Sequence, residues 1–475
     1  MPVDLNAPLE LKTADTAVLD DLQGNILKGH GRNNTINLFL QFDAAQAATA
    51  RAFVKTLANK VTSASKQFAD TERFKASNKQ IPGDTFVALF LSFAGYQALG
   101  INAAQIPGDA SFQAGLQAQG GILNDPPVNK WDAHFQGAVH AMVLIGDDDK
   151  VKREQMQSEI VALMSSAVKL VGKEKGLAMR NTSNDGIEHF GYVDGRSQPL
   201  LLIEDIEHET DMTDGTHVWN PAFPLKQALV SCPGGTAGTS FGSYFVFRKL
   251  EQNVKGFKKR EKKVADILQL PEKDRELAGA MIVGRFEDGT PVTLHFEDGA
   301  DNPVPNNFNY ESDTKGAKCP FHGHIRKTNP RGESVGAFAA DLEEERSHIM
   351  ARRGITYGKR VWENGAVNTV LDENHLPSKN VGLLFMAYQN DIGNQFEFTQ
   401  RFWANNEGFV KSDPITGQPL TGLDPIIGQG VPTIQLQQSR EWGKDNKGSF
   451  DHRSFVTLKG GEYFYAPCIS FLKSV

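Results

Sequence analysis

Alternation of apolar and polar residues predicts strands in the first part of the chain. Ile36, Leu38, Leu40 and Phe42 share one face of residues 36–42, which is typical of a half-buried strand. More continuous apolar runs predict strands at 85–93 and 138–145, and helical spacing predicts helices at 44–60 and about 150–171. With an extended segment near 187–193, this order is that of a split β-α-β unit with an antiparallel, ferredoxin-like sheet.

A similar mixture of elements recurs in the second part of the chain. Strands are predicted at 244–250, 382–388 and 461–465, and helices at 258–268, 274–283 and 394–404. Prolines and glycines concentrate between Met212 and Gly238, which indicates a domain boundary or a crossover loop. We therefore predict an α+β protein of two ferredoxin-like halves, residues 1–222 and 223–475, each an antiparallel sheet with helices. The long polar connections 286–345 and 406–455 are expected to carry function.

Composition narrows the class of protein. A chain of 475 residues favours two domains, and a net charge of -7 argues against a broad nucleic-acid-binding surface. The amino terminus lacks the basic and apolar regions of a secretory signal, and no apolar run approaches the roughly 18 residues that cross a membrane. We therefore expect a soluble, cytoplasmic protein. The cysteines, Cys232, Cys319 and Cys468, are too far apart in sequence to indicate a disulfide framework or a Cys-x-x-Cys site.

Three segments could carry chemistry, and the first contains two histidines. In Cys319-Pro-Phe-His-Gly-His-Ile-Arg-Lys-Thr-Asn-Pro-Arg331, two prolines frame His322 and His324, and cations follow them. A histidine held in this way could bind a metal or haem, with cations beside an anionic cofactor edge. The alternative is a basic surface loop that happens to contain two histidines.

The other two segments offer a carboxylate and a pair of cations. Gly191 and Gly195 flank Asp194, so a tight turn could aim the carboxylate away from the sheet; a simple Asp-Gly turn is the alternative. Arg352 and Arg353 precede a glycine, which is equally typical of a helix end. No Rossmann, Walker or His-Glu-x-x-His motif is present.

Taken together and in this order, the three segments resemble the dye-decolorizing peroxidase family. The shared patterns are Gly-x-x-Asp-Gly-x-Ser-Gln-Pro, then Cys-Pro-x-x-x-His-Ile-Arg-Lys-x-Asn-Pro-Arg, then Arg-Arg-Gly-x-x-Tyr-Gly. Leu22-Gln-Gly-Asn-Ile-Leu, Gly382-Leu-Leu-Phe-Met-Ala-Tyr-Gln and Gly460-Gly-Glu-Tyr-Phe-Tyr-Ala-Pro also fit that family. The resemblance extends from about residue 20 to the carboxyl terminus.

The resemblance implies one haem b per chain, lying between the halves or within the carboxyl-terminal half. His324 matches the proximal iron ligand, whereas His322 is not expected to bind iron. Asp194 and Arg352 match the distal catalytic pair, in preference to Arg353. Further cofactor contacts are expected from Arg326, Arg352, Leu383 and Phe385. The family usually pairs its proximal histidine with a carboxylate, for which the candidates are Glu397 and Asp391.

The implied function is reduction of hydrogen peroxide through a ferryl haem, with one-electron oxidation of dyes and other aromatic or phenolic donors. The alternative is a haem-binding protein for haem or iron handling, and a third reading is a ferredoxin-like protein without haem. Asp194 and Arg352 separate these readings, because a carrier has no need of a peroxide-cleaving pair. Electron transfer from bulky donors would draw on tyrosines and on Trp131, Trp219, Trp362, Trp403 and Trp442. The pattern is compatible with a homodimer.

Overall fold

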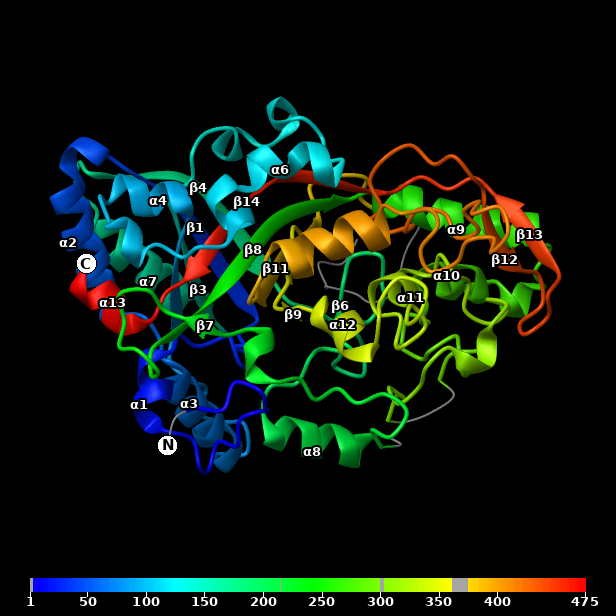
Figure 1. The fold of residues 1–475 in the computed structure, drawn as a ribbon, viewed down its shortest axis with the longest axis horizontal. Coiled ribbons are helices and arrows are strands. Elements are labelled where there is room, and N and C mark those ends of the chain that lie inside the picture. Colours follow the sequence, from blue (N-terminus) through cyan, green and yellow to red (C-terminus); the bar gives the residue numbers. More distant parts are fainter. Residues whose placement is uncertain (1–2, 214, 300–302, 361–374) are drawn as a thin grey trace.

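One large antiparallel sheet organises the molecule (Figure 1). The computed structural model describes residues 3–213, 215–299, 303–360 and 375–475. In spatial order, the ten strands of the sheet are β7 (Val230–Ser231), β8 (Phe241–Gln252), β14 (Val456–Ala466), β2 (Phe86–Leu91), β3 (Ala141–Asp147), β1 (Asn34–Phe42), β4 (Val168–Leu177), β10 (Ile355–Tyr357), β11 (Gly382–Gln389) and β9 (Ala351–Arg352).

The sheet closes on itself, because β8 pairs with both β14 and β11. The ring runs from β8 through β14, β2, β3, β1, β4 and β10 to β11, and closure leaves these strands without an open edge. The α+β class with antiparallel strands is confirmed. Strands from both sides of residue 222 share the ring, since β14 pairs with β2 and β10 pairs with β4. The boundary at 222/223 stays a prediction.

Helices pack at both ends of the molecule (Figure 1). The end that contains both termini carries α1 (Thr16–Asp21), α2 (Ala47–Ala58), α3 (Ala64–Ala76), α4 (Phe93–Ala98), α7 (Lys150–Ala162) and α13 (Ile469–Ser474). The other end carries α9 (Val254–Leu268), α10 (Glu276–Val283) and the hairpin of β12 (Leu436–Ser439) and β13 (Lys447–Phe450), built on a second hydrophobic core. The remaining elements are α5 (Ala110–Ala114), α6 (Leu116–Leu123), α8 (Ile203–Met212), α11 (His324–Thr328), α12 (Leu342–Ser347), β5 (Met179–Arg180) and β6 (Gly186–Ile187).

Two elements differ from the sequence prediction. The helix predicted to reach about residue 171 ends at Ala162, and Val168–Leu177 forms β4 against β1. Gly172 and Gly176 fit this strand, because a Cβ at either position would lie within 2.5 Å of a neighbouring side chain. The helix predicted at 394–404 is present as two wide-turn segments, Gly393–Glu397 and Thr399–Ala404.

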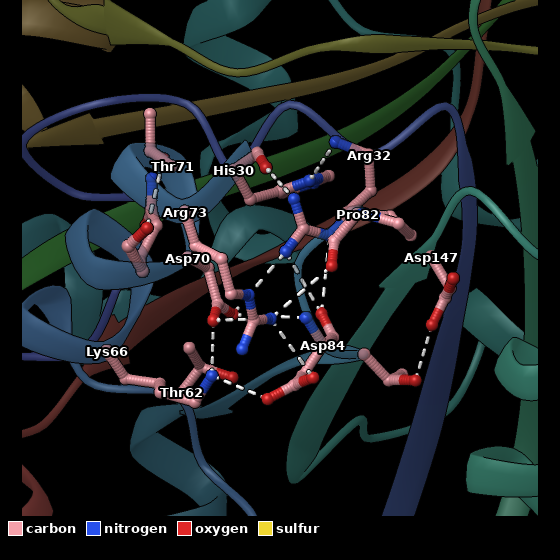
Figure 2. Close-up of polar contacts among 12 residues, drawn as sticks. His30, Arg32, Thr62, Lys66, Asp70, Thr71, Arg73, Pro82, Asp84 and Asp147 are labelled. Atoms are coloured by element: carbon pink, nitrogen blue, oxygen red, sulfur yellow. Dashed lines mark hydrogen bonds and ion pairs between the residues drawn. The ribbon is translucent and has the colours of Figure 1, made fainter. Parts of the chain in front are cut away.

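The amino-terminal arm, residues 22–32, is fixed by polar contacts. Gln23 exchanges hydrogen bonds with the backbone of Leu89 in β2, and its amide also donates to the carbonyl of Pro467. At the other end of the arm, Figure 2 shows Arg32 directed toward the carboxylate of Asp70, at 3.7 Å. That carboxylate is 4% exposed and also accepts from Arg73 at 3.0 Å. The cluster anchors the arm to α3. The backbone carbonyls of the arm are therefore held in fixed positions, where they accept hydrogen bonds from Arg353.

Two buried histidines make the fold sensitive to acid. His189 and His452 each donate Nε2–H to a backbone carbonyl, and burial lowers the pKa of each ring to about 4. The folded protein therefore takes up these protons near pH 4, whereas the unfolded chain takes them up near pH ~6.5. As pH falls from about 6.5 to about 4, each histidine should lower the free energy of unfolding by about 1.4 kcal/mol per pH unit.

Thermal unfolding followed across that pH window checks this expectation. The melting temperature should fall as pH falls, and His189→Gln, which keeps a donor toward Tyr357, should flatten the slope. A melting temperature that is constant between neutral and acidic pH would contradict the proposed linkage.

Among the described residues, no helix is long and apolar enough to cross a membrane.

Candidate functional site

A deep cavity lies beside the ring of strands. Together with the open solvent at its mouth, the space free of protein atoms here measures about 1620 Å³. Its walls are mainly apolar, with a few polar and charged groups, as is usual for cofactor pockets. Five of the residues predicted from sequence line it together: Asp194, His324, Arg352, Leu383 and Phe385. The cavity therefore gathers side chains that are up to 191 positions apart in the chain.

His324 begins α11 on one wall of the cavity. The end of α10 packs closely behind it, because Gly284 has a φ of +102° and a Cβ there would lie 3.1 Å from Cβ of Ile325. Nδ1 of His324 lies 2.9 Å from Oδ2 of Asp424, whose side chain is fully buried. This contact leaves Nε2 as the ring nitrogen available to a metal.

Asp424 is held as an anion by several donors. Its Oδ1 accepts from the backbone N–H groups of Ile426 and Ile427, at 2.8 and 2.9 Å. Burial raises the pKa of Asp424, but the electrostatic attraction of His324 and the hydrogen bonds from His324, Ile427 and Ile426 outweigh burial and lower it overall. The carboxylate is therefore suited to accept a proton-bearing Nδ1 and to fix the ring orientation.

The two carboxylates that sequence suggested for this role lie elsewhere. Glu397 accepts hydrogen bonds from Ser111 and from the hydroxyl of Tyr463, and Asp391 accepts from the backbone of Asn394. Both candidates are therefore wrong. The acceptor is Asp424, which lies 100 positions after His324 in the connection 406–455. That connection was expected to carry function, but only the fold shows which of its residues reaches the histidine.

The cations after His324 hold the wall together instead of facing the cavity. Arg326 is fully buried, forms ion pairs with Asp313 and Glu333, and does not line the cavity. Its predicted contact with a cofactor is therefore not supported. Lys327 donates to the carbonyls of Asn406 and Gly422 at 2.8 and 2.6 Å, and burial lowers its pKa to about 7. This lysine ties α11 to the loop that leads to Asp424.

His322 lies outside the cavity. Its ring is 1% exposed and packs edge-on against Phe450, with ring centroids 6.0 Å apart. Burial lowers its pKa to about 3, so the ring is neutral. The prediction that His322 is not the ligand is consistent with this position.

Asp194 and Arg352 meet in the lining of the same cavity. Nη1 of Arg352 lies 3.3 Å from Oδ1 of Asp194, and both side chains are about one third exposed, at 36% and 34%. Asp194 sits in a turn in which Gly191 and Gly195 have φ values of +111° and +90°, which only glycine adopts without strain. Arg352 belongs to β9, which pairs with β11, the strand of Leu383 and Phe385. The pair is thus fixed by a turn and a sheet edge.

Arg353 points to the amino-terminal arm. Its guanidinium donates to the carbonyls of Asn25 and Ile26, at 3.0 and 3.1 Å, and burial lowers its pKa to about 10. The arm motif Leu22-Gln-Gly-Asn-Ile-Leu therefore holds the residue next to Arg352. This arrangement agrees with the assignment of the distal role to Arg352.

Two further arginines were missed from sequence. Arg285 lines the cavity, and Arg331 lies behind it; both donate to Ser197 and to the side chain of Asn306. Burial lowers their pKa values to about 10 and about 9. Among the described residues no carboxylate lies within ion-pair distance of either, and both Nε groups are buried without an acceptor. Glu209, which accepts from Asn306, raises both pKa values but burial outweighs it, so the two buried cations favour a further anionic group nearby.

The tryptophans lie at different depths. Trp131, Trp219 and Trp403 are buried, and Trp442 is half-buried, whereas Trp362 lies outside the described residues. Trp403 packs edge-on against His348, a residue of the cavity wall, with ring centroids 5.4 Å apart. Which residue carries electrons stays open.

Comparison with known proteins gives a consistent result. The sequence model described as "DyP dimeric alpha+beta barrel domain" matches residues 21–180. The chain is 48% identical to the multifunctional dye peroxidase DyP2 of Amycolatopsis sp., over 100% of both chains. It is 32% identical to a dye-decolorizing peroxidase of Exidia glandulosa, over 95% of this chain and 86% of the relative.

Solved structures agree with the sequence comparison. DyP2 from Amycolatopsis sp. superposes with a TM-score of 0.92 at 46% identity, covering 100% of both chains. A DyP-type peroxidase from Anabaena sp. gives a TM-score of 0.90 at 39% identity, covering 99% of this chain and 98% of the other. A dye-decolorizing peroxidase in complex with 2,6-dimethoxyphenol gives 0.75 at 30% identity, covering 96% and 99%.

Proposed function

We propose, since this chain belongs to the dye-decolorizing peroxidase family, that its cavity binds one haem b with His324 as the iron ligand. The family membership makes the chain a peroxidase that acts on dyes and aromatic donors. We propose the identity of the cofactor and the roles of individual residues from the side chains that line the cavity.

The donor set of the cavity suits haem. Apolar walls suit the porphyrin, and a neutral imidazole with a carboxylate on its other nitrogen suits the iron. Haem also carries propionates, which are anionic, and the buried cations of Arg285 and Arg331 have no carboxylate partner in the described part of the chain. We assign Arg285, which lines the cavity, to the anionic edge of the cofactor in place of Arg326, with Arg331 adding its charge from behind the lining.

Bound haem supplies an iron that takes oxidising equivalents from hydrogen peroxide and passes them to electron donors. Asp194 accepts a proton at a carboxylate oxygen from one peroxide oxygen and delivers it to the other. Arg352 orients that carboxylate through Nη1 and stabilises the negative charge that develops on the leaving oxygen. Leu383 and Phe385 also line the cavity, and walls of this kind should keep bulky dyes outside it, where they would react.

The observation that carries the proposal is the placement of Asp194 and Arg352 on the same cavity as His324. A haem carrier needs the ligand, but it has no need of an acid–base group paired with a fixed cation. The pair therefore favours a peroxidase over the carrier considered from sequence. A bound phenol in one relative supports phenolic donors for this chain. The match to a domain described as dimeric supports a homodimer, which light scattering can test.

Absorption spectroscopy tests the proposal directly. The purified protein, or the protein after haem is added, should show a Soret band, and peroxide should change that band before a phenolic donor restores it. A protein that stays colourless after haem is added would reject the cofactor and the site together. A Soret band that does not respond to peroxide would leave the haem site standing and reject the roles of Asp194 and Arg352.

Replacing Asp424 with asparagine should weaken the site. The substitution removes the charge that holds Nδ1–H of His324, so we expect haem affinity or peroxidase activity to fall about 10–100-fold. Haem titration and steady-state kinetics measure the two effects. Asp391→Asn is the matched control, because Asp391 is exposed and caps only Asn394. Equal losses in both variants would contradict the role of Asp424.

A further inference from the structure

Two cysteines far apart in sequence lie in contact at the end of the molecule that carries both termini. Cys232 follows β7 and Cys468 immediately precedes α13, 236 positions later. The backbone N–H of Cys468 donates to Sγ of Cys232 at 3.1 Å, and the two thiols lie close enough to shift each other's pKa in opposite directions. Sequence spacing gave no indication of this pair, and the pairing of β7 and β14 with β8 brings it together.

The backbone of a turn lies against the pair on one side. Residues 233–238 form this turn, whose glycines 234 and 238 are exposed. A Cβ at Gly235 would lie 2.8 Å from Sγ of Cys468, so the turn presses directly on the sulfur. Both cysteines are buried, and the hydroxyl of Ser470 donates to Cys468 at 3.5 Å. A local opening of this turn would expose both sulfurs to a small oxidant without unfolding the ring.

We propose that Cys232 and Cys468 are an oxidation site, a dithiol that hydrogen peroxide converts to an intramolecular disulfide. The sulfur of Cys468 attacks one peroxide oxygen, the O–O bond breaks, and a sulfenic acid and one water form. The sulfur of Cys232 then attacks the sulfenic sulfur, the S–S bond forms, and a second water leaves. Two thiols are oxidised and one peroxide is reduced to two waters, so the step needs no other oxidant than the enzyme's own substrate.

The order of the two attacks follows from the contacts. The contact with Cys232 lowers the pKa of Cys468 and raises that of Cys232, and the hydroxyl of Ser470 donates to the sulfur of Cys468 at 3.5 Å, which also favours its thiolate. The thiolate is the nucleophile, so Cys468 reacts with peroxide and Cys232 resolves the product. The third cysteine, Cys319, is fully buried apart from this pair, and burial raises its pKa to about 12. Cys319 therefore serves as an internal control that peroxide should leave reduced.

The disulfide would fasten the carboxyl-terminal helix to the sheet. α13 packs on α2, and β7 pairs with β8, so the bridge would join two elements that the chain connects only through 236 positions. A bridge across so long a segment restricts the unfolded chain strongly. The oxidised enzyme should therefore unfold at a temperature several degrees higher than the reduced enzyme.

Thiol counting on the holoenzyme tests the proposal. After a peroxide pulse and denaturation, intact mass and alkylation should show the loss of two hydrogen atoms, one reactive thiol at Cys319, and a linked peptide that contains Cys232 and Cys468. Dithiothreitol should restore all the thiols and the lower melting temperature. Three reactive thiols after treatment, or a disulfide that involves Cys319, would overturn the proposal.

Single variants test the assigned order. In Cys232→Ser, peroxide should convert Cys468 to a sulfenic acid that no second thiol resolves, and dimedone should trap it. In Cys468→Ser, Cys232 should stay reduced under the same treatment. Trapping at Cys232 instead of Cys468 would overturn the order. These measurements do not use the haem spectrum. The dithiol proposal can therefore be rejected while the haem site is confirmed, and the haem site can be rejected while the dithiol proposal is confirmed.

Discussion

Replacing His324 with alanine should abolish tight haem binding. The imidazole of His324 forms the only bond that we predict between the protein and the iron. Its loss should therefore lower haem affinity by more than roughly 10–100-fold, which is the usual effect of losing the hydrogen-bond partner of a ligand. The Soret band and the haem content per chain measure the effect. Added imidazole should restore part of the absorption, because the truncated side chain leaves room beside Asp424.

His322→Ala is the matched control for that variant. The ring of His322 is buried against Phe450 and does not line the cavity, so its removal should lower the melting temperature and leave the haem content unchanged. If His322→Ala loses haem and His324→Ala keeps it, the assignment of the ligand is wrong. Failure of imidazole to restore absorption in His324→Ala would indicate a structural collapse instead of a lost ligand.

Replacing Arg352 with leucine should slow the reaction with peroxide by about 10²–10³-fold, the usual cost of removing a preorganised group that stabilises charge. The side chain contributes its fixed charge and its contact with Asp194 at 3.3 Å, and leucine removes both. Stopped-flow mixing with peroxide measures the rate. The rate of the later step with a phenolic donor should change little, because that step involves no O–O bond cleavage.

Arg353→Lys provides the comparison for Arg352. Lysine keeps the charge but cannot reach the carbonyls of Asn25 and Ile26 together, so the variant should lose stability at the arm. Its reaction with peroxide should stay close to that of the unmodified enzyme. An unchanged rate in Arg352→Leu with a large loss in Arg353→Lys would transfer the distal role to Arg353.

Local patterns predicted most elements, because apolar periodicity reflects the side of each element that is buried. The strands near Ile36, Val87 and Val143 and helices such as Val254–Leu268 were recognised in this way. β4 was missed, because lysines and glycines interrupt its apolar residues and its buried positions include Glu174 and Gly176. Closure of the ring could not be predicted, because pairing between β8 and β11 depends on tertiary geometry and not on local sequence.

The residues of the functional site were also predicted only where a local motif contains them. His324, Asp194 and Arg352 lie in local motifs and were identified, and the cavity brings them together. Asp424 was missed, because nothing in its own segment records which side chain it reaches across 100 positions. Arg285 was missed and Arg326 was misassigned for a related reason, since only burial and the presence or absence of carboxylate partners separate the two arginines.

The position of β14 in the ring has a consequence for synthesis of the chain. β14 ends at Ala466, nine residues before the carboxyl terminus, yet it lies between β8 and β2, and Tyr465 pairs with Leu91. Both neighbours therefore keep open edges until β14 has been synthesised, and open edges invite association with other chains. Ribosome-bound chains that stop before Val456 should be aggregation-prone, and the ring should close only once residues 456–466 have left the ribosome.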